Sequence, residues 1–199
     1  MIEYNLAFLS SHGGSNMQAI IDACKSGDLK MNPALIISNN SGSKALERAR
    51  KENIPFCHLS SATHPDPEEL DRTMKDVLTK YNITLIILAG YMKKIGHQVL
   101  SAWNNRIVNI HPALLPAYGG QGMYGLNVHK AVIANKENMT GITVHLVDEK
   151  YDHGKILNQI KIPVPSGCTA EELQQTVLRQ EHLFFTETLK KVYSGEISL

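Results

Sequence analysis

The amino-acid sequence predicts an α/β fold with a mostly parallel central sheet, helices on both faces and a mixed edge near the C-terminus. Two observations predict it. In the first half of the chain, short apolar runs alternate with segments of helical periodicity, and runs without polar alternation are typical of parallel strands covered on both faces. In the second half, two longer strand-like segments follow each other across a short loop, which permits an antiparallel or otherwise mixed edge.

The first half is predicted to alternate strand and helix. Residues 6–9 form the first apolar run, and the next helix has its apolar face on Met17, Ile20, Ile21 and Cys24, at i, i+3, i+4 and i+7. Because ligand sites in parallel sheets lie beyond the carboxyl ends of the strands, the chemistry is expected just after such runs. The later elements are strands at 34–38, 56–59 and 84–90, and helices at 44–51 and 70–78.

The second half is predicted to be organised differently. A strand at 106–110 leads into a loop rich in proline and glycine at 111–125, and two longer strands follow at 141–147 and 155–162. The last helix begins with a capping box, Thr169-Ala-Glu-Glu, whose first and last side chains exchange hydrogen bonds with the backbone. Its buried face is predicted to hold Leu173, Val177, Phe184, Leu189 and Val192.

Composition and charge exclude several classes of protein. With 20 Lys+Arg and 19 Asp+Glu the formal charge is +1, so the chain lacks the basic excess of a nucleic-acid-binding domain. No apolar run is long enough to span a membrane, and the first residues lack the basic start of a signal peptide. We therefore expect a cytoplasmic monomer or homodimer that acts on small molecules, without nucleic acid or membrane.

Cysteines and histidines give no sign of a metal. Cys24, Cys57 and Cys168 are widely spaced, which predicts reduced thiols rather than a disulfide framework or a zinc site. The histidines show no ligand-like spacing, so no metal is expected. His145 falls inside a predicted strand and is interpreted as a buried, hydrogen-bonded group.

The first chemical motif, Leu9-Ser-Ser-His-Gly-Gly-Ser-Asn-Met, lies between a strand and a helix. Gly13 and Gly14 allow tight turns with exposed N–H groups, and Ser15 and Asn16 add donors at a helix N-terminus, where the dipole favours an anion. A phosphate would fit, although the motif is neither a Walker A loop nor G-x-G-x-x-G. A capped turn without a ligand is the alternative.

The second motif, Asn109-Ile-His-Pro, lies at a strand end. Asn109 and His111 are two positions apart, so both side chains point to the same side of the sheet, and Pro112 stiffens the exit. An amide that donates and an imidazole that titrates near neutral pH can together hold an oxyanion and move a proton. A structural histidine is the alternative.

The third motif, Asp148-Glu-Lys-Tyr-Asp-His-Gly, is the turn between the last two strands. A carboxylate in this turn can approach His111, where it would stabilise the imidazolium form and raise the histidine pKa. The alternative is an acidic surface turn.

The fourth motif, Ala89-Gly-Tyr-Met-Lys-Lys-Ile, follows the most apolar strand. A glycine at a strand end lets a ligand approach the backbone, and aromatic, methionine and aliphatic neighbours suit a flat heterocycle. The alternative is core packing at a strand exit.

Taken together, these motifs resemble those of the folate-dependent formyltransferases over nearly the whole chain. The resemblance runs from Gly13-Gly-Ser-Asn-Met-Gln-Ala-Ile to Gln180-Glu-His in the last helix. The stretch 109–116 together with Asp152 is specific to this superfamily, and the Gly-Ser-Asn loop narrows the resemblance to the branch that acts on a phosphoribosyl amine.

The resemblance implies a Rossmann-like formyltransferase fold of a single domain, residues 1–199. The half at about 1–100 would bind phosphate, and the half at about 101–199 would be catalytic and bind folate. The implied reaction transfers the formyl group of 10-formyltetrahydrofolate, a co-substrate, to the amine of 5-phosphoribosylglycinamide in purine biosynthesis, without a metal.

The resemblance also implies residue roles. Asn109 and His111 would stabilise the oxyanion, with His111 as proton donor, while Asp152 raises the pKa of His111 and helps to relay the amine proton. The phosphate contacts fall on Gly14, Ser15 and Asn16, and a substrate-side glutamate falls on Glu181. The folate pocket falls on Met92, Lys93, Lys94, Ile95 and Asn109, and on Asp148, Glu149, Lys150, Tyr151 and Asp152.

The sequence departs from the family pattern at several positions. Lys93 stands where arginine is common, and His153 replaces the first glycine of a more usual Asp-Gly-Gly turn. An arginine that contacts folate in some members aligns near Pro67. The glycine-rich loop from Gly119 to Gly125 has the composition of a mobile lid.

Three alternatives to this function remain at the level of sequence. Formyltetrahydrofolate hydrolase shares the chemistry but adds an N-terminal regulatory domain, whereas here the first strand is expected within a few residues of Met1. Methionyl-tRNA formyltransferase adds a basic C-terminal domain, which the charge balance disfavours. In a non-catalytic phosphate- or folate-binding module, Asn109, His111 and Asp152 would have no reason to converge.

Overall fold

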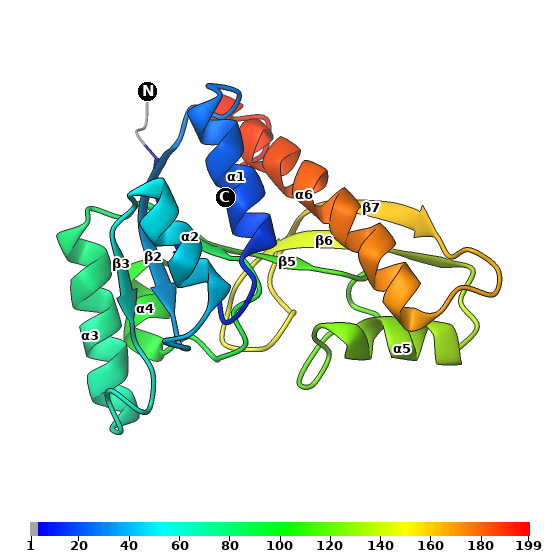
Figure 1. Ribbon diagram of the computed structural model, residues 1–199, viewed down its shortest axis with the longest axis horizontal. Coiled ribbons are helices and arrows are strands. Elements are labelled where there is room, and N and C mark those ends of the chain that lie inside the picture. Colours follow the sequence, from blue (N-terminus) through cyan, green and yellow to red (C-terminus); the bar gives the residue numbers. More distant parts are fainter. Residues whose placement is uncertain (1–3) are drawn as a thin grey trace. The chain divides into compact units, whose positions relative to one another are not determined.

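The structure, a computed structural model, describes residues 4–199 and contains a seven-stranded sheet with helices around it (Figure 1). The strands are hydrogen-bonded in the order β3-β2-β1-β4-β5-β6-β7. The pairs β1–β2, β1–β4 and β2–β3 are parallel, and β6–β7 is antiparallel, which confirms the predicted α/β class with a mixed edge. Residues 1–3, where an early start of the first strand was expected, lie outside the described residues.

The chain divides into two compact units between Val108 and Asn109, and each is described in turn. Unit 1 alternates strand and helix as predicted, and its strands have buried apolar interiors except the short, partly exposed strand at 56–58. Its elements are β1 (Asn5–Leu9), α1 (Ser15–Lys25), β2 (Asn32–Ser38), α2 (Lys44–Glu52), β3 (Phe56–His58), α3 (Pro67–Lys80), β4 (Leu85–Leu88) and α4 (His97–Ala102).

The short helix α4 of unit 1 was not predicted, because its stabilising contact is not local in sequence. The carboxylate of Asp71, on α3, accepts hydrogen bonds from the backbone N–H groups of Gln98 at 2.7 Å and Val99 at 3.3 Å. These groups are among the first N–H groups of α4, which have no intrahelical acceptor. A side chain from the preceding helix therefore caps α4, and no capping residue marks its start in the sequence.

Unit 2 is built on a long antiparallel pair of strands along which the last helix packs (Figure 1). The pairing register of these two strands shifts between Val144 and His145, near the turn that joins them. The predicted capping box is confirmed, since Thr169 and Glu172 exchange side-chain and backbone hydrogen bonds. The elements are β5 (Ile107–His111), which crosses the division between the units, α5 (Leu126–Ala134), β6 (Met139–Leu146), β7 (Ile156–Pro163) and α6 (Ala170–Ser194).

The buried face of α6 differs from the prediction at one aromatic residue. Phe185 is fully buried, whereas Phe184, which was predicted to face the core, is only partly buried. The buried positions recur every four residues through a charged residue, Glu181, and this spacing selects Phe185 rather than its neighbour. The prediction was wrong because the buried stripe runs through a glutamate, and apolar periodicity does not include a charged residue. The stripe contains Leu173, Val177, Glu181, Phe185 and Leu189.

Among residues 4–199, none of the helices combines the length and the apolar character that crossing a membrane requires. Cys24, Cys57 and Cys168 carry free thiols, and each is partly buried.

Helix α5 was also not predicted, and it carries a buried histidine. His129 is 2% exposed, and its Nδ1 has no hydrogen-bond partner within residues 4–199. Burial, with a smaller contribution from the nearby His111, lowers the pKa of His129 from 6.5 to about 4. The folded protein therefore holds His129 neutral at pH values where the unfolded chain would protonate it.

This buried histidine predicts a loss of stability in mild acid. A lowered folded-state pKa contributes stability that is present above the unfolded pKa of 6.5 and is lost as pH falls toward about 4. The contribution amounts to at most about 3 kcal/mol. In urea unfolding at a series of pH values, His129→Leu should lose less free energy of unfolding than the parent protein between pH 6.5 and 4. Equal losses in the two proteins would contradict the assignment.

Candidate active site

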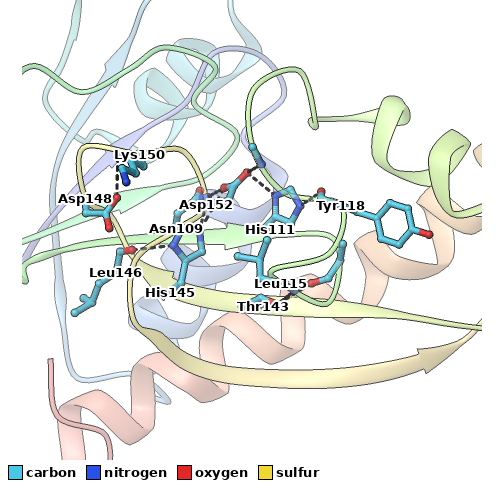
Figure 2. A network of polar contacts seen from close by, with 12 residues as sticks. Asn109, His111, Leu115, Tyr118, Thr143, His145, Leu146, Asp148, Lys150 and Asp152 are labelled. Carbon is cyan, nitrogen blue, oxygen red and sulfur yellow. Dashed lines mark hydrogen bonds and ion pairs between the residues drawn. The ribbon is translucent and has the colours of Figure 1, made fainter.

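The candidate site of unit 2 begins at the carboxyl end of β5. Asn109 and His111 alternate with the buried Ile110, and both side chains turn to one side of the strand (Figure 2). The segment that follows is fixed to β6 by Thr143. Its hydroxyl donates to the carbonyl of Ala113 at 2.6 Å and accepts the N–H of Leu115 at 3.1 Å. Two hydrogen bonds therefore hold the chain that follows β5 against β6.

Asp152 reaches these two residues from the turn between β6 and β7. Its backbone lies in the left-handed region, at φ 55, which is unusual for a residue other than glycine. Oδ2 lies 3.5 Å from His111 Nδ1 and accepts the backbone N–H of Gly120 at 2.9 Å. Oδ1 lies 3.5 Å from Asn109 Nδ2. An amide, an imidazole and a carboxylate that are distant in sequence thus meet in one place (Figure 2).

The protonation pattern of His111 follows from its backbone contact. Nε2 lies 2.7 Å from the carbonyl oxygen of Tyr118, which can only accept, so Nε2 carries a proton. The second nitrogen, Nδ1, is then the site that gains or loses a proton, and it faces Asp152. Proton exchange at His111 therefore takes place beside a carboxylate.

His145 is a fourth member of this cluster, which residue types in the sequence did not reveal. Its Nδ1 donates to the carbonyl of Leu146 at 2.8 Å, so its Nε2 accepts the Nδ2 hydrogen of Asn109 at 3.1 Å when the ring is neutral. The same Nε2 lies 3.5 Å from Asp152 Oδ1. His145 is buried and hydrogen-bonded, in agreement with its interpretation from sequence, and it turns the donor end of the Asn109 amide into the cluster.

The pKa values in the cluster differ in part from the sequence prediction. The charge of Asp152 raises the pKa of His111, as predicted, but burial lowers this pKa by more, so the net shift is downward. Burial also raises the pKa of Asp152, but the contacts with His145, His111 and the Gly120 N–H together outweigh it, and this pKa is lowered. At neutral pH the cluster therefore contains an ionised carboxylate beside a neutral imidazole.

The glycine-rich loop at 119–125 is connected to this cluster at its start. Tyr118 accepts from His111, and Gly120 donates to Asp152. Tyr118 also has a left-handed backbone, at φ 57, and its hydroxyl donates to Glu137 Oε1 at 2.7 Å. The backbone at 118–120 therefore holds both the imidazole of His111 and the carboxylate of Asp152.

The turn that carries Asp152 has its own polar contacts. Asp148 accepts the backbone N–H of Lys150 at 2.8 Å and pairs with His153 Nδ1 at 3.1 Å. Tyr151 and Glu149 are exposed, with Tyr151 at 49%. His153, which departs from the family pattern, therefore faces an acidic neighbour in the turn rather than the cluster around His111.

The first predicted motif lies in unit 1, at the start of α1. Gly14 is the N-cap of α1 and has φ 65, and a Cβ there would lie 3.0 Å from Met17 Cε and 3.1 Å from Ala45 Cβ. Ser15 and Asn16 form the first turn, with Asn16 buried at 9% exposure. The arrangement presents a helix N-terminus with donor side chains, which is a favourable place for an anion.

The fourth predicted motif also lies in unit 1, directly after β4. The backbone N–H of Met92 donates to Ser11 Oγ at 2.8 Å, which joins this segment to the end of β1. Met92 is 40% exposed and Ile95 is buried at 6%, while Lys93 and Lys94 are exposed. An exposed apolar side chain at the carboxyl end of a parallel strand is a suitable surface for a flat ring.

Two further predicted positions lie on helices. Glu181 lies on the buried stripe of α6 with 7% exposure. Pro67 is the first residue of α3, after the N-cap Asp66. In the part of the chain that the structure describes, no group of three or more His, Cys, Asp or Glu side chains could hold a metal ion.

Comparison with known proteins gives consistent matches. A sequence profile described as "Formyl transferase" matches residues 4–189. The chain is 40% identical over 193 residues to the chloroplastic phosphoribosylglycinamide formyltransferase of Arabidopsis thaliana, covering 96% of this chain and 66% of the relative. It therefore spans about two thirds of the length of that plant protein.

A bacterial relative and a solved structure agree with this match. The phosphoribosylglycinamide formyltransferase of Haemophilus influenzae is 35% identical over 194 residues, which cover 98% of this chain and 89% of the relative. The crystal structure of glycinamide ribonucleotide transformylase 1 from Symbiobacterium toebii superposes with a TM-score of 0.92 at 33% identity, covering 99% of this chain and 91% of that one.

Proposed function

The chain belongs to the formyl transferase family, and from this premise we propose that it transfers the formyl group of 10-formyltetrahydrofolate to the amine of 5-phosphoribosylglycinamide (GAR). The products are formyl-GAR and tetrahydrofolate, and the reaction belongs to de novo purine biosynthesis. The observation that carries the proposal is the convergence of Asn109, His111 and Asp152 in a chain whose relatives bear the name of this enzyme.

We assign the proton transfers to His111. The GAR amine attacks the formyl carbon, and the carbonyl oxygen becomes an oxyanion. Because His111 is neutral at neutral pH, it takes the proton that the attacking nitrogen loses, and Asp152 stabilises the resulting imidazolium. His111 then gives this proton to the folate nitrogen as the bond between that nitrogen and the formyl carbon breaks.

Asn109 is assigned to the oxyanion. One of its Nδ2 hydrogens is held by His145 at 3.1 Å, while the contact with Asp152 at 3.5 Å is at the limit of hydrogen bonding. The second N–H, which Asp152 holds only weakly, is therefore available to the oxyanion. A positioned donor of this kind typically contributes about 10²- to 10³-fold in rate.

The remaining assignments concern binding. We propose that the loop at Gly14, Ser15 and Asn16 binds the GAR phosphate, and that Glu181 binds the substrate. The folate would contact the segment from Met92 to Ile95, Asn109 and the turn from Asp148 to Asp152. A single domain over residues 1–199, action in the cytoplasm as a monomer or homodimer, and the absence of nucleic acid, membrane and metal from the reaction all stay predictions.

The proposed function is tested by a spectroscopic assay of tetrahydrofolate formation from 10-formyltetrahydrofolate, with GAR and without it. If the protein is a transferase, 10-formyltetrahydrofolate should be consumed only when GAR is present. One molecule of formyl-GAR should then appear for each molecule of tetrahydrofolate. Consumption at the same rate without GAR would identify a hydrolase. Binding of both ligands without turnover would identify a non-catalytic module.

The lowered pKa of His111 predicts the pH dependence of turnover. Since His111 acts first as a base, kcat at saturating substrates should stay constant from neutral pH down to about 6.5, the ordinary histidine pKa, and fall only below it. Initial rates over this range provide the measurement. A kcat that rises as the solution becomes acidic would instead require a protonated His111 at the start of the reaction.

A substitution of His145 tests how Asn109 is oriented. His145→Leu should lower kcat by about tenfold to a hundredfold, because the amide stays in place but loses the acceptor that turns it. In a background that already carries Asn109→Ala, the same substitution should have little further effect on kcat. Equal losses in both backgrounds would show that His145 acts independently of Asn109.

A further inference from the structure

The loop between β1 and α1 is in contact with α2 through two of its backbone carbonyls. The N–H of Ala45, in the first turn of α2, donates to the carbonyl of His12 at 3.0 Å. Arg48 Nε, one turn later, donates to the carbonyl of Gly13 at 3.0 Å. Successive peptide oxygens of the loop are thus bound by one helix.

These two bonds fix the direction of the loop N–H groups. In a trans peptide unit the C=O and the N–H point in opposite directions. The carbonyl of His12 shares its plane with the N–H of Gly13, and the carbonyl of Gly13 shares its plane with the N–H of Gly14. With both oxygens turned toward α2, both N–H groups point away from it and can face an anion.

Arg48 is itself held in place by a chain of polar contacts. Its Nη1 donates to Gln18 Oε1 at 3.2 Å. The Gln18 amide is oriented in turn, because its Nε2 donates at 2.9 Å to both Asp22 Oδ1 and Glu52 Oε1. The planar guanidinium therefore bridges the loop to the side of α1, which a lysine, with a single flexible ammonium, would not reproduce.

We infer that Arg48 is a positioning residue of the phosphate-binding loop. It acts on the substrate phosphate through the Gly13 carbonyl, by holding the Gly13–Gly14 peptide with its N–H directed to the anion. The inference rests on the proposed function of this loop. It assigns to α2 a part in substrate binding that neither the glycine motif nor the charge of the chain indicates.

The test compares Arg48→Met with Arg50→Met. Both remove one positive charge from α2, but the Arg50 guanidinium lies over the Phe56 ring, 4.8 Å from its centroid, and makes no part of the loop contact. Arg48→Met should raise the KM for GAR by about tenfold, with kcat and the KM for 10-formyltetrahydrofolate unchanged. Arg50→Met should leave all three constants within about twofold.

A substrate without phosphate separates positioning from general damage. With glycinamide riboside, the parent protein and Arg48→Met should have the same kcat/KM, since the loop has no anion to bind. The inference would be overturned if Arg48→Met lost as much kcat/KM with the riboside as with GAR. It would also be overturned if Arg50→Met raised the KM for GAR as much as Arg48→Met does, or if Arg48→Met left this KM unchanged. If Arg48→Met does not fold, Arg48→Lys replaces it and should give a smaller increase in KM for GAR; a KM equal to that of the parent would overturn the inference.

Inorganic phosphate distinguishes this inference from the proposed reaction. In a titration followed by the amide signals of Gly13 and Gly14, Arg48→Met should bind phosphate about tenfold more weakly than the parent and Arg50→Met equally well. This result would support the role of Arg48 even if the parent protein failed to formylate GAR. Equal phosphate affinity in the parent and Arg48→Met would contradict it.

Discussion

Replacing His111 by alanine is expected to lower kcat by about 10³-fold while leaving substrate binding nearly unchanged. General acid–base catalysis by a positioned side chain typically contributes about 10²- to 10⁴-fold in rate. In the proposed reaction His111 handles the proton twice, once as it leaves the amine and once as it reaches the folate nitrogen. Its Nε2 is engaged with the Tyr118 carbonyl, so all of this exchange uses Nδ1 beside Asp152.

The measurement is steady-state kinetics of formyl transfer, with the dissociation constants of both substrates measured separately. His64→Ala provides a matched control, because His64 lies in the loop before α3 and its ring contacts the hydroxyl of the neighbouring Thr63. Rates within about threefold of the parent for His111→Ala would remove His111 from the mechanism. A loss of binding in place of turnover would reassign it to the substrate pocket.

Replacing Asp152 by asparagine is expected to lower kcat by about 10²- to 10³-fold. The substitution keeps the size of the side chain but removes the charge that stabilises the His111 imidazolium. It also replaces one acceptor by a donor, whereas the present carboxylate accepts from Gly120 with one oxygen and from Asn109 with the other. At least one of these contacts must then be lost.

The pH profile separates the charge of Asp152 from its hydrogen bonds. Asp152 raises the pKa of His111 against the larger effect of burial, so its removal should lower that pKa further. The acid limb of kcat should therefore move to lower pH in Asp152→Asn. Asp76→Asn, a change of the same kind at an exposed position of α3, should leave both the rate and the pH of the acid limb unchanged. If kcat fell at the same acidic pH in Asp152→Asn and in the parent, the charge of Asp152 would not act on the pKa of His111.

The sequence predicted the elements that repeat a local pattern and missed those held by distant contacts. The strand and helix alternation of unit 1 and the capping box at Thr169 follow from periodicity and capping chemistry. Helix α4 depends on a cap from Asp71, which lies on another helix. The buried face of α6 holds Phe185 rather than Phe184 because it runs through the charged Glu181, which apolar periodicity does not include.

The candidate site shows the same division. The i and i+2 spacing of Asn109 and His111 placed both side chains on one side of β5, and this could be read from the sequence. The role of His145 in orienting the Asn109 amide could not be read from the sequence, because it depends on which ring nitrogen the Leu146 carbonyl engages. The raising effect of Asp152 on the His111 pKa could be predicted, but the larger lowering effect of burial could not, since burial is a property of the folded chain.

The central claim is that the cluster at Asn109, His111 and Asp152 transfers a formyl group to an amine. The most direct test uses 10-formyltetrahydrofolate labelled with ¹³C in the formyl group and follows the label by NMR in the presence of GAR. The account predicts that the label appears as the formamide of formyl-GAR in the parent protein, and at least about 100-fold more slowly in His111→Ala. Label recovered as free formate, or formamide formed equally fast by the variant, would contradict it.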